Sequence, residues 1–322
     1  MFTHKDIENK SIFVINGLEH QNLRVKTGFL FLEDTANNKA ITKFPFPKIL
    51  FLIIIGHTNI TSALIESCNK HKIPVVVMKP NFRNVLSFGN FADANFLLRK
   101  KQHLQPSSRQ DIAKAIITNK FQNQLSLLTK TRKKDLKTKI AIRNLTYAIL
   151  NIDKIEDIKN IMALEGRVAK FFFAAYFQDL NWTSRKPRIK SDQLNSCLDI
   201  SYTILFNFIE NMCRLFGFDL YVGIYHQLWF RRKSLVCDLI EPFRCIVEHQ
   251  VLKSFNYGTF KNSDFENIRN SYVLKYGERE KYTSAIYKSI IPYKSDIFKY
   301  IQNYYRCFMA DKLANEYPTF NY

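Results

Sequence analysis

Two apolar runs near the start of the chain constrain its fold most strongly. The segment ILFLIIIG (49–56) contains no polar side chain, and IPVVVM (73–78) is similar. Such short aliphatic runs are typical of strands covered on both faces. The segment between them, 57–72, has a helical pattern, with Thr58 or Thr61 as a possible N-cap. Its apolar positions share one face: Ile60, Ala63, Leu64 and Cys68. The sequence therefore predicts a β-helix-β unit.

The residues before this unit also have a strand pattern. Their segments alternate apolar and polar residues or are rich in β-branched and aromatic ones, namely 11–15, 22–34 and 39–46. Gly17, Gly28 and the segment 36–38 supply turns between them. We expect residues 1–85 to form a small β-rich domain.

The rest of the chain is dominated by helical patterns. The segment 79–95 holds Pro80, Gly89 and four asparagines, so we place a linker at 86–95. Beyond it, 110–130 and 198–217 have the pattern of long helices, the second ending at Gly217. The predicted fold class is α+β, with a larger all-α domain at 96–322 after the β-rich one.

The charge balance predicts a polyanionic partner. The chain has 48 Lys and Arg against 28 Asp and Glu, a net charge of +20. Nucleic acid is the first candidate, although a merely basic soluble protein is the alternative. No apolar segment reaches the ~20 residues of a membrane helix, and we expect a cytoplasmic protein without a membrane. The six cysteines include no C-x-x-C pair, so we expect reduced thiols and no zinc site.

Two basic runs are candidates for phosphate contact, with a solvated surface as the alternative. The run 130–139 has six Lys or Arg in ten residues, and 185–190 contains a proline and is expected to be a loop. The candidate DNA-binding residues in these runs are Arg132, Lys133, Lys134, Arg185, Lys186, Arg188 and Lys190.

One carboxylate stands out in the helical part. The segment IMALEGRVAKFFFAAYF (161–177) has Glu165 as its single acidic residue among mostly apolar, small and aromatic ones. On a helix, this residue shares a face with Val168, Ala169, Phe172 and Tyr176. Burying a carboxylate is costly unless it is paired or binds a metal. Two interpretations stay open: an ion pair with a Lys or Arg of another helix, or a metal ligand.

A second polar group lies in the segment 217–251. His226 follows an apolar stretch, and Asp238 and Glu241 come twelve and fifteen residues later. Because Pro242 is tolerated only near a helix start, we expect both acids in the first turn of one helix. There they are either a capping box or ligands of a metal ion. One histidine and two or three carboxylates suit Mg²⁺ or Mn²⁺, and such a site in a basic protein indicates phosphodiester chemistry.

These two segments resemble the signature blocks of a known family. LEGRVAKFFFAAYF (164–177) and GIYHQLWFRRKSLVCDLIEPFR (223–244) are similar to the motifs of the CRISPR-associated integrase-endonuclease, the nuclease that inserts new spacers into CRISPR arrays. The resemblance covers essentially the whole chain.

The resemblance implies that Glu165, His226 and Glu241 are catalytic metal ligands. It makes Asp238 a neighbouring acid on which activity depends in some relatives. It also places Arg244 where it could orient Glu241 or a phosphate. Tyr176 matches the family motif and could line the site. Where the family often has a proline and an aspartate, this chain has Cys245 and Glu248.

The resemblance also implies a reaction and partners. A prespacer 3′-hydroxyl would attack a phosphodiester at the edge of a CRISPR repeat, by metal-dependent transesterification, and hydrolysis would be a related reaction. The family acts on double-stranded DNA as a homodimer joined through its N-terminal domains. Two dimers bridge a dimer of a small ferredoxin-like CRISPR-associated partner. Two alternatives stay open: a basic helical DNA-binding protein without catalysis, and a general metal-dependent DNase.

Overall fold

The chain divides into two compact units in the computed structural model. Unit 1 comprises Met1–Asn95 and Arg214–Gly217, and unit 2 comprises Phe96–Cys213 and Phe218–Tyr322. The division falls at the end of the segment 86–95 that the sequence predicts as a linker. The structure describes residues 3–17, 21–34, 37, 39–89, 91–104, 109–132 and 134–322.

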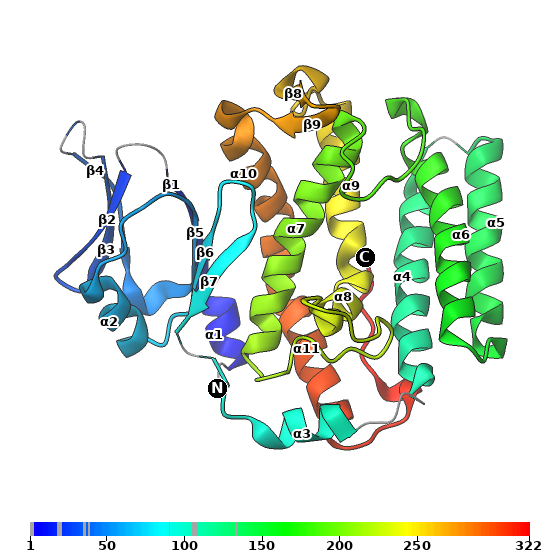
Figure 1. Cartoon of the computed structure of the whole chain (residues 1–322), viewed down its shortest axis with the longest axis horizontal. Helices are drawn as coiled ribbons and strands as arrows, with labels where there is room; N and C mark the ends of the chain where they lie inside the picture. The colour runs from blue at the N-terminus through cyan, green and yellow to red at the C-terminus, as the bar shows by residue number, and fades with distance from the viewer. Residues whose placement is uncertain are drawn as a thin grey trace. The chain divides into compact units, whose positions relative to one another are not determined.

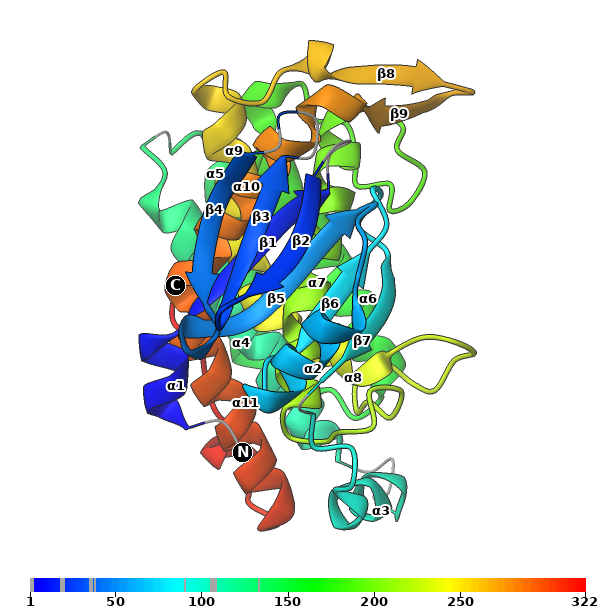
Figure 2. The same ribbon diagram turned by 90° about the vertical axis from the view of Figure 1, so that its left-hand side faces the viewer.

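Unit 1 is built mainly from strands (Figures 1 and 2). It contains the short helix α1 (His4–Asn9), and α2 (Ser62–Lys70) follows β5. Thr61 caps α2, because its hydroxyl accepts the amide hydrogen of Leu64. The strands are β1 (Ser11–Gly17), β2 (Gln21–Lys26), β3 (Phe29–Asp34), β4 (Lys39–Pro45), β5 (Ile49–Gly56), β6 (Val75–Met78) and β7 (Asn84–Phe88). The sequence does not predict α1 or β7, and β7 overlaps the first part of the expected linker.

The strands form two sheets, of order β1-β5-β6-β7 and β2-β3-β4. β1, β5 and β6 are parallel to one another, whereas β7 is antiparallel to β6. The predicted β-helix-β unit is confirmed as β5–α2–β6, since a parallel pair needs a crossover between its strands. β5 is buried along seven of its eight residues.

One hydrophobic cluster joins both sheets to α2. Its members come from β1, β2, β3, β5, β6 and α2, and include Ile15, Leu23, Leu30, Leu52, Leu64 and Val75. Phe46, in the single turn between β4 and β5, is 1% exposed and belongs to the same cluster. Because β5 is buried along almost its whole length, a polar side chain in this run would be costly, which explains why it carries none.

Unit 2 is predominantly helical. Its α-helices are α3 (Phe96–Leu104), α4 (Gln110–Lys130), α5 (Leu136–Asn151), α6 (Ile158–Tyr176), α7 (Gln193–Arg214), α8 (Ser234–Leu239), α9 (Arg244–Asn256), α10 (Arg279–Ile290) and α11 (Lys294–Met309). Figure 1 shows α4, α5 and α6 standing side by side. Asp135 and Asp157 begin α5 and α6 as N-caps that accept backbone amide hydrogens.

Two details differ from the sequence prediction. A hairpin of β8 (Phe265–Ile268) and β9 (Ser271–Leu274) interrupts the helical unit, which is therefore not all-α. The helix expected to stop at Gly217 ends at Arg214. Gly217 has φ of +83°, and a Cβ there would lie 2.1 Å from the carbonyl oxygen of Ala92. The α+β class itself is confirmed.

The last residues of unit 2 run along α4. Asn119 Oδ1 and Nδ2 bond the backbone of Phe320 at 2.8 Å each. Asn123 Oδ1 accepts the Tyr322 amide at 3.0 Å, and Ser126 Oγ donates to the Tyr322 carbonyl at 2.7 Å. These side chains satisfy backbone groups that would otherwise be buried without partners. In the part of the chain that the structure describes, no helix is long and apolar enough to span a membrane.

Candidate active site

Glu165 and Glu241 meet at one buried lysine. Glu165 lies on α6, and Glu241 begins the single turn Glu241–Phe243 between α8 and α9. Lys120, on α4, is 5% exposed. Its Nζ donates to Glu165 Oε1 and lies 2.7 Å from Glu241 Oε2. Two carboxylates from different elements therefore surround a single cation position.

Arg244 holds the other oxygen of Glu241. Its Nη2 donates to Glu241 Oε1 at 2.8 Å. Burial by itself would raise the pKa of Glu241, but Arg244 and Lys120 outweigh it and lower that pKa to about 2. Burial would lower the pKa of Lys120, yet the charges of Glu165 and Glu241 raise it overall. All three groups are therefore charged at neutral pH.

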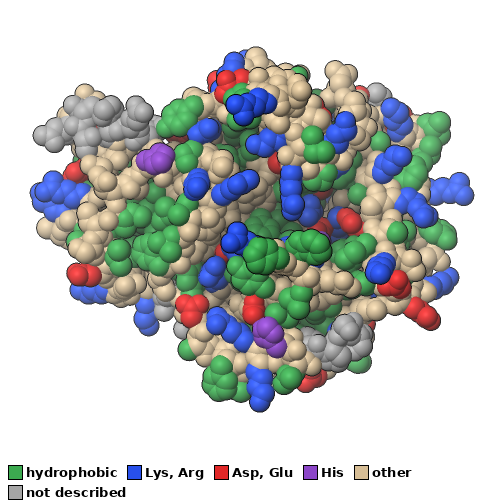
Figure 3. All heavy atoms as spheres, in the orientation of Figure 1, with side chains coloured by type: hydrophobic (Ala, Val, Ile, Leu, Met, Phe, Trp, Pro, Cys, Tyr) green, Lys and Arg blue, Asp and Glu red, His purple; other side chains and the backbone are tan. Residues whose placement is uncertain are grey.

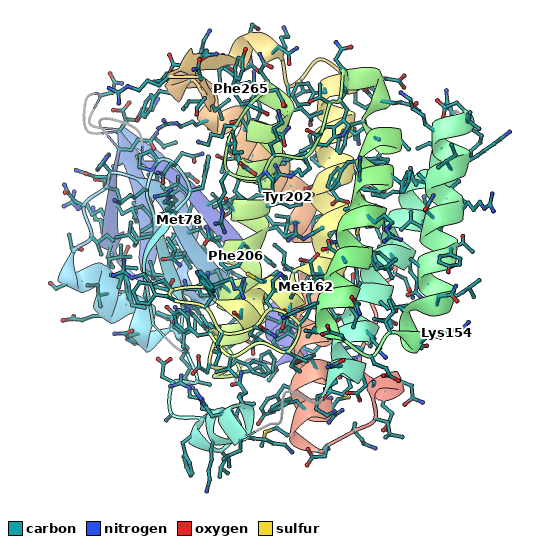
Figure 4. The ribbon with its side chains drawn as sticks, turned by 45° about the vertical axis from the view of Figure 1, so that its right-hand side comes forward. Met78, Lys154, Met162, Tyr202, Phe206 and Phe265 are labelled. Carbon is teal, nitrogen blue, oxygen red and sulfur yellow. The ribbon has the colours of Figure 1, made fainter. Side chains whose placement is uncertain are left out.

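Tyr202 on α7 extends this network toward α9 (Figure 4). The Arg244 guanidinium lies over the Tyr202 ring, 4.7 Å from its centroid. The Tyr202 hydroxyl donates to Glu248 Oε1 at 2.7 Å. Glu248, whose role the sequence leaves open, is fully buried, and burial raises its pKa. These contacts fix the Arg244 side chain, which in turn orients Glu241.

His226 is held by Asp238. His226 lies in the loop before α8, and its Nδ1 is 2.7 Å from Asp238 Oδ1. Asp238 also accepts the backbone amide hydrogens of Ile224, Tyr225 and His226 at 2.6, 3.0 and 2.8 Å. A neutral imidazole that donates from Nδ1 presents the lone pair of Nε2. Histidines that bind a metal through Nε2 commonly donate from Nδ1 to a carboxylate in this way.

His226 and Tyr225 are electrostatically linked to the two glutamates. A proton on His226 would lower the pKa of Glu241, so the two side chains lie within electrostatic range of each other. Burial raises the pKa of Tyr225, and Glu165 and Glu241 raise it further. The Tyr225 hydroxyl is buried without a hydrogen-bond partner in the described structure. The histidine loop and the carboxylates therefore face the same region of unit 2.

The donor set suits a hard divalent ion. Two carboxylates and one imidazole nitrogen are ligands that Mn²⁺ accepts, and the carboxylates also suit Mg²⁺. The lysine between the carboxylates marks a position where a cation is stabilised. Within the described residues, however, no three His, Cys, Asp or Glu side chains are already grouped closely enough to hold a metal. The residues fit such an ion by chemistry, while Lys120 occupies the position between the acids.

Two expectations about this region need correction. Asp238 and Glu241 do not share the first turn of one helix, because α8 ends at Leu239 and α9 begins at Arg244. Pro242 lacks an amide hydrogen and disfavours helical backbone at the residue before it, which explains the break. The capping-box alternative is also wrong, since α9 has no side-chain cap. Asp238 instead binds the loop that carries His226.

The ion pair considered for Glu165 does exist, with Lys120 as its partner. Tyr176 lies eleven residues farther along α6, about 16 Å along the helix axis. It is buried, and its ring stacks on Phe172 with centroids 5.2 Å apart. The roles of Glu165 as a metal ligand and of Tyr176 at the site stay predictions.

Among the basic candidates, two side chains are engaged within the fold. Lys134 Nζ donates to the carbonyls of Leu128 and Thr129 at 2.6 and 2.7 Å, at the end of α4. Arg185 pairs with Asp199 and donates to Asn195 Oδ1 at 2.9 Å. Both residues therefore stabilise local structure.

Most of the other basic candidates are exposed, so their charges are available for contact with phosphate. Arg132, Lys186 and Arg188 are exposed and Lys190 is half-buried, whereas Lys133 lies outside the described residues. Figure 3 shows Lys and Arg scattered over the visible face rather than gathered at one place.

Lys120 is not among the site residues predicted from the sequence. The sequence pattern that could have revealed it is the one that reveals Glu165, a single charged residue on the apolar side of a helix. Apolar residues at positions 112, 113, 116, 117 and 121 surround it on α4. One turn later, Asn123 Nδ2 donates to the Pro242 carbonyl at 2.9 Å, which ties the Glu241 turn to α4.

The loop after His226 exposes large apolar side chains. Leu228, Trp229 and Phe230 are 68%, 73% and 80% exposed. The Arg231 guanidinium lies 5.0 Å from the centroid of the Phe230 ring. Exposed aromatic rings beside a cation suit stacking against bases of single-stranded nucleic acid.

Comparisons with known proteins identify the family to which the sequence is similar. The model of the family "CRISPR associated protein Cas1" matches residues 17–288. A CRISPR-associated endonuclease Cas1 of Thermodesulfovibrio yellowstonii is 26% identical over 310 residues, which cover 92% of this chain and 97% of that protein.

Solved structures show the same fold. A casposase bound to integration product has a TM-score of 0.75 at 19% identity, covering 94% of this chain and 91% of that one. A chain of a Cas6-RT-Cas1–Cas2 complex has a TM-score of 0.76 at 18% identity, covering 96% of this chain and 36% of that one.

Proposed function

The chain belongs to the CRISPR-associated protein Cas1 family, and on this premise we propose that it is a metal-dependent DNA endonuclease and integrase of CRISPR adaptation. Its curated relatives are named endonucleases, which supports nuclease activity. The observation that carries the proposal is the convergence of Glu165 and Glu241 on one buried cation position. The Asp238-held His226 faces the same region.

In the proposed reaction, the 3′-hydroxyl oxygen of a prespacer strand bonds to a phosphorus atom in the CRISPR repeat. The bond from that phosphorus to the 3′-oxygen of the repeat strand breaks, and this oxygen takes up a proton as the attacking hydroxyl loses one. Water in place of the prespacer hydroxyl would give hydrolysis. Glu165, His226 and Glu241 would hold Mg²⁺ or Mn²⁺, which would supply Lewis-acid stabilisation and a more acidic hydroxyl.

The chain's own residues organise this site. Asp238 fixes the ring of His226, so Nε2 points in one direction. Arg244 holds Glu241 through Oε1 and is itself packed on Tyr202. This arrangement keeps one carboxylate in a defined orientation before DNA arrives, which is how preorganised sites lower a barrier.

Exposed basic and aromatic side chains would bind the DNA. Phosphate contacts from residues such as Arg132, Lys186 and Arg188 are insensitive to sequence. Trp229 and Phe230 lie only three and four residues beyond His226, so an unpaired base could stack there while its strand enters the site.

We also propose the assembly that the family resemblance implies. Unit 1 would join two copies into a homodimer, and the dimer would bind a small ferredoxin-like CRISPR-associated partner. The likeness to a chain of a complex that contains Cas2 supports a partner of this kind. Light scattering after gel filtration, with and without the partner, tests both statements.

A strand-transfer assay tests the function. The substrates are a 3′-hydroxyl duplex and a supercoiled plasmid with a CRISPR repeat, incubated with Mn²⁺ or Mg²⁺ and the partner protein. Wild type should join the DNAs only with metal, and Glu165→Gln, His226→Ala and Glu241→Gln should each lower the rate by about 100-fold or more. Full integration by Glu165→Gln would contradict the site. Hydrolysis without joining would favour a general DNase, and binding without cleavage a non-catalytic protein.

A further inference from the structure

Lys120 occupies the position that a divalent ion would need. Its Nζ contacts Glu165 Oε1 and lies 2.7 Å from Glu241 Oε2, so both glutamates contribute an oxygen to it. The side chain is 6% exposed, whereas that of Glu165 is 25% exposed. An ammonium and a metal ion cannot occupy the space between the same two oxygens together.

The four charged groups that meet at this position balance one another without a metal. Glu165 and Glu241 contribute two negative charges, and Lys120 and Arg244 contribute two positive ones. A divalent ion added to these four groups would leave an excess of two positive charges among them, at a position largely removed from water, which is unfavourable. A bound phosphodiester would reduce that excess to one. A pentacovalent phosphorane, with two negative charges, would cancel it.

The structure allows Lys120 to move while its helix stays in place. The ammonium is carried on a flexible four-carbon stem. In contrast, α4 is fixed on both sides of this residue, because Asn119 and Asn123 bond the backbone of Phe320 and Asn123 also bonds Pro242. A change in the position of Nζ therefore need not disturb the backbone around Glu241.

We propose that Lys120 is an internal competitor of the divalent ion and links metal binding to DNA binding. This inference rests on the proposed metal-dependent function. In the free protein the ammonium holds the two glutamates. When DNA is bound, the ammonium turns to a phosphate oxygen and releases both carboxylates to the ion. Linkage then requires that DNA strengthens metal binding by the same factor as the metal strengthens DNA binding.

Calorimetric titration with Mn²⁺, with and without a short DNA duplex, tests the proposal. Wild type is compared with Lys120→Gln, which keeps a hydrogen-bond donor but removes the charge. Without DNA, the Gln variant should bind Mn²⁺ about ten-fold more tightly than wild type. DNA should strengthen Mn²⁺ binding about ten-fold in wild type and less than about three-fold in the variant.

Two further variants serve as controls. Lys114→Gln removes the same charge from the same helix, where Nζ bonds only the Asp153 carbonyl among its described contacts, and should behave as wild type. Lys120→Arg keeps a cation between the glutamates and should bind Mn²⁺ no more tightly than wild type. The change in melting temperature on adding Mn²⁺, measured within each variant, shows binding even where the variant is less stable.

Equal or weaker Mn²⁺ binding by Lys120→Gln would overturn the inference. If the variant does not fold, absence of a DNA effect on Mn²⁺ binding in wild type would overturn it equally. The proposed function would survive either result, provided that Glu165→Gln abolishes the binding seen in wild type. If wild type binds no Mn²⁺ with or without DNA, the metal-dependent function itself fails.

Discussion

The carboxylate of Asp238 lies 2.7 Å from Nδ1 of His226 and also accepts the backbone amide hydrogen of that same residue. Asp238 is fully buried, and the amides of Ile224 and Tyr225 bond it as well. One side chain therefore determines both the path of the loop and the orientation of the imidazole ring. Removing its charge should affect both.

We expect Asp238→Asn to lower the free energy of unfolding by about 2–4 kcal/mol, because an amide nitrogen would then face the backbone donors that the carboxylate accepts. Strand transfer should also fall by about 10- to 100-fold, since the ring of His226 loses its support. Urea unfolding and the strand-transfer assay measure the two effects.

Asp219→Asn is the control. Asp219 pairs with His103 at 2.9 Å, and the histidine side chain is 59% exposed. Loss of this pair should therefore lower the free energy of unfolding by about 1 kcal/mol or less. Equal costs for the two variants would contradict the role of Asp238.

Two glycine substitutions should change stability in opposite directions. A Cβ on Gly223 would lie 2.7 Å from Asp238 Oδ2 and 2.8 Å from the carbonyl carbon of Ser234, so Gly223→Ala should destabilise the protein by about 1–3 kcal/mol. A Cβ on Gly166, inside α6, would meet nothing within 4 Å. Gly166→Ala should therefore stabilise the helix by about 0.5–1 kcal/mol. Thermal unfolding of both variants measures the difference, and a shift of the same sign in both would disprove it.

Acid should weaken the fold through Glu241. The pKa of Glu241 is lowered from 4.5 to about 2 in the folded protein, because Arg244 and Lys120 outweigh the effect of burial. Its contribution to stability is therefore complete above pH 4.5 and is lost as the pH falls toward 2. Between these values the free energy of unfolding should drop by up to about 1.4 kcal/mol per pH unit from this group. Denaturant unfolding at pH 3.0 to 5.5 should give a shallower dependence for Glu241→Gln.

Glu248 should affect the pH dependence of stability in the opposite direction to Glu241. Burial raises its pKa above 4.5, so its favourable contribution is complete below pH 4.5 and is lost as the pH rises through the folded-state pKa. Glu248→Gln should remove this loss and make stability decline less on the alkaline side of pH 4.5. An unchanged profile in both variants would show that neither carboxylate titrates as its surroundings indicate.

The basic candidates should separate into two classes. Lys134→Ala and Arg185→Ala should lower stability by about 1–2 kcal/mol, because each removes hydrogen bonds to the fold. Arg132→Ala and Lys186→Ala should leave stability within about 0.5 kcal/mol. Each should weaken DNA binding and reduce the salt dependence by about one unit of slope per lost phosphate contact. Fluorescence anisotropy at several salt concentrations gives the slope, and unchanged slopes for the exposed pair would exclude them from the interface.

Local patterns were sufficient for much of unit 1. The apolar run of β5 admits few alternatives to a buried strand, and the helix after it has a cap at Thr61. The β8–β9 hairpin was not predicted because its strands are four residues each and partly exposed. Short segments of this kind carry too little periodicity to be recognised.

The site was predictable only in part. Glu165, His226 and Glu241 stand out as residue types in unusual surroundings. The role of Lys120, in contrast, depends on the packing of α4 against α6, which brings it to Glu165. Asp238 could be mistaken for a helix cap because its partners belong to a loop twelve to fourteen residues earlier. Likewise, Lys134 and Arg185 differ from the other basic residues only through hydrogen bonds that the fold creates.

The bonds between α4 and residues 320–322 have a consequence for the order of events during synthesis. A ribosome makes α4 early in unit 2, whereas its partners Phe320 and Tyr322 emerge after every other element of that unit. The helix that carries Lys120 thus lacks several of its native hydrogen bonds while the chain is still being elongated. The site on α4 can therefore reach its final set of hydrogen bonds only after residues 320–322 have left the exit tunnel.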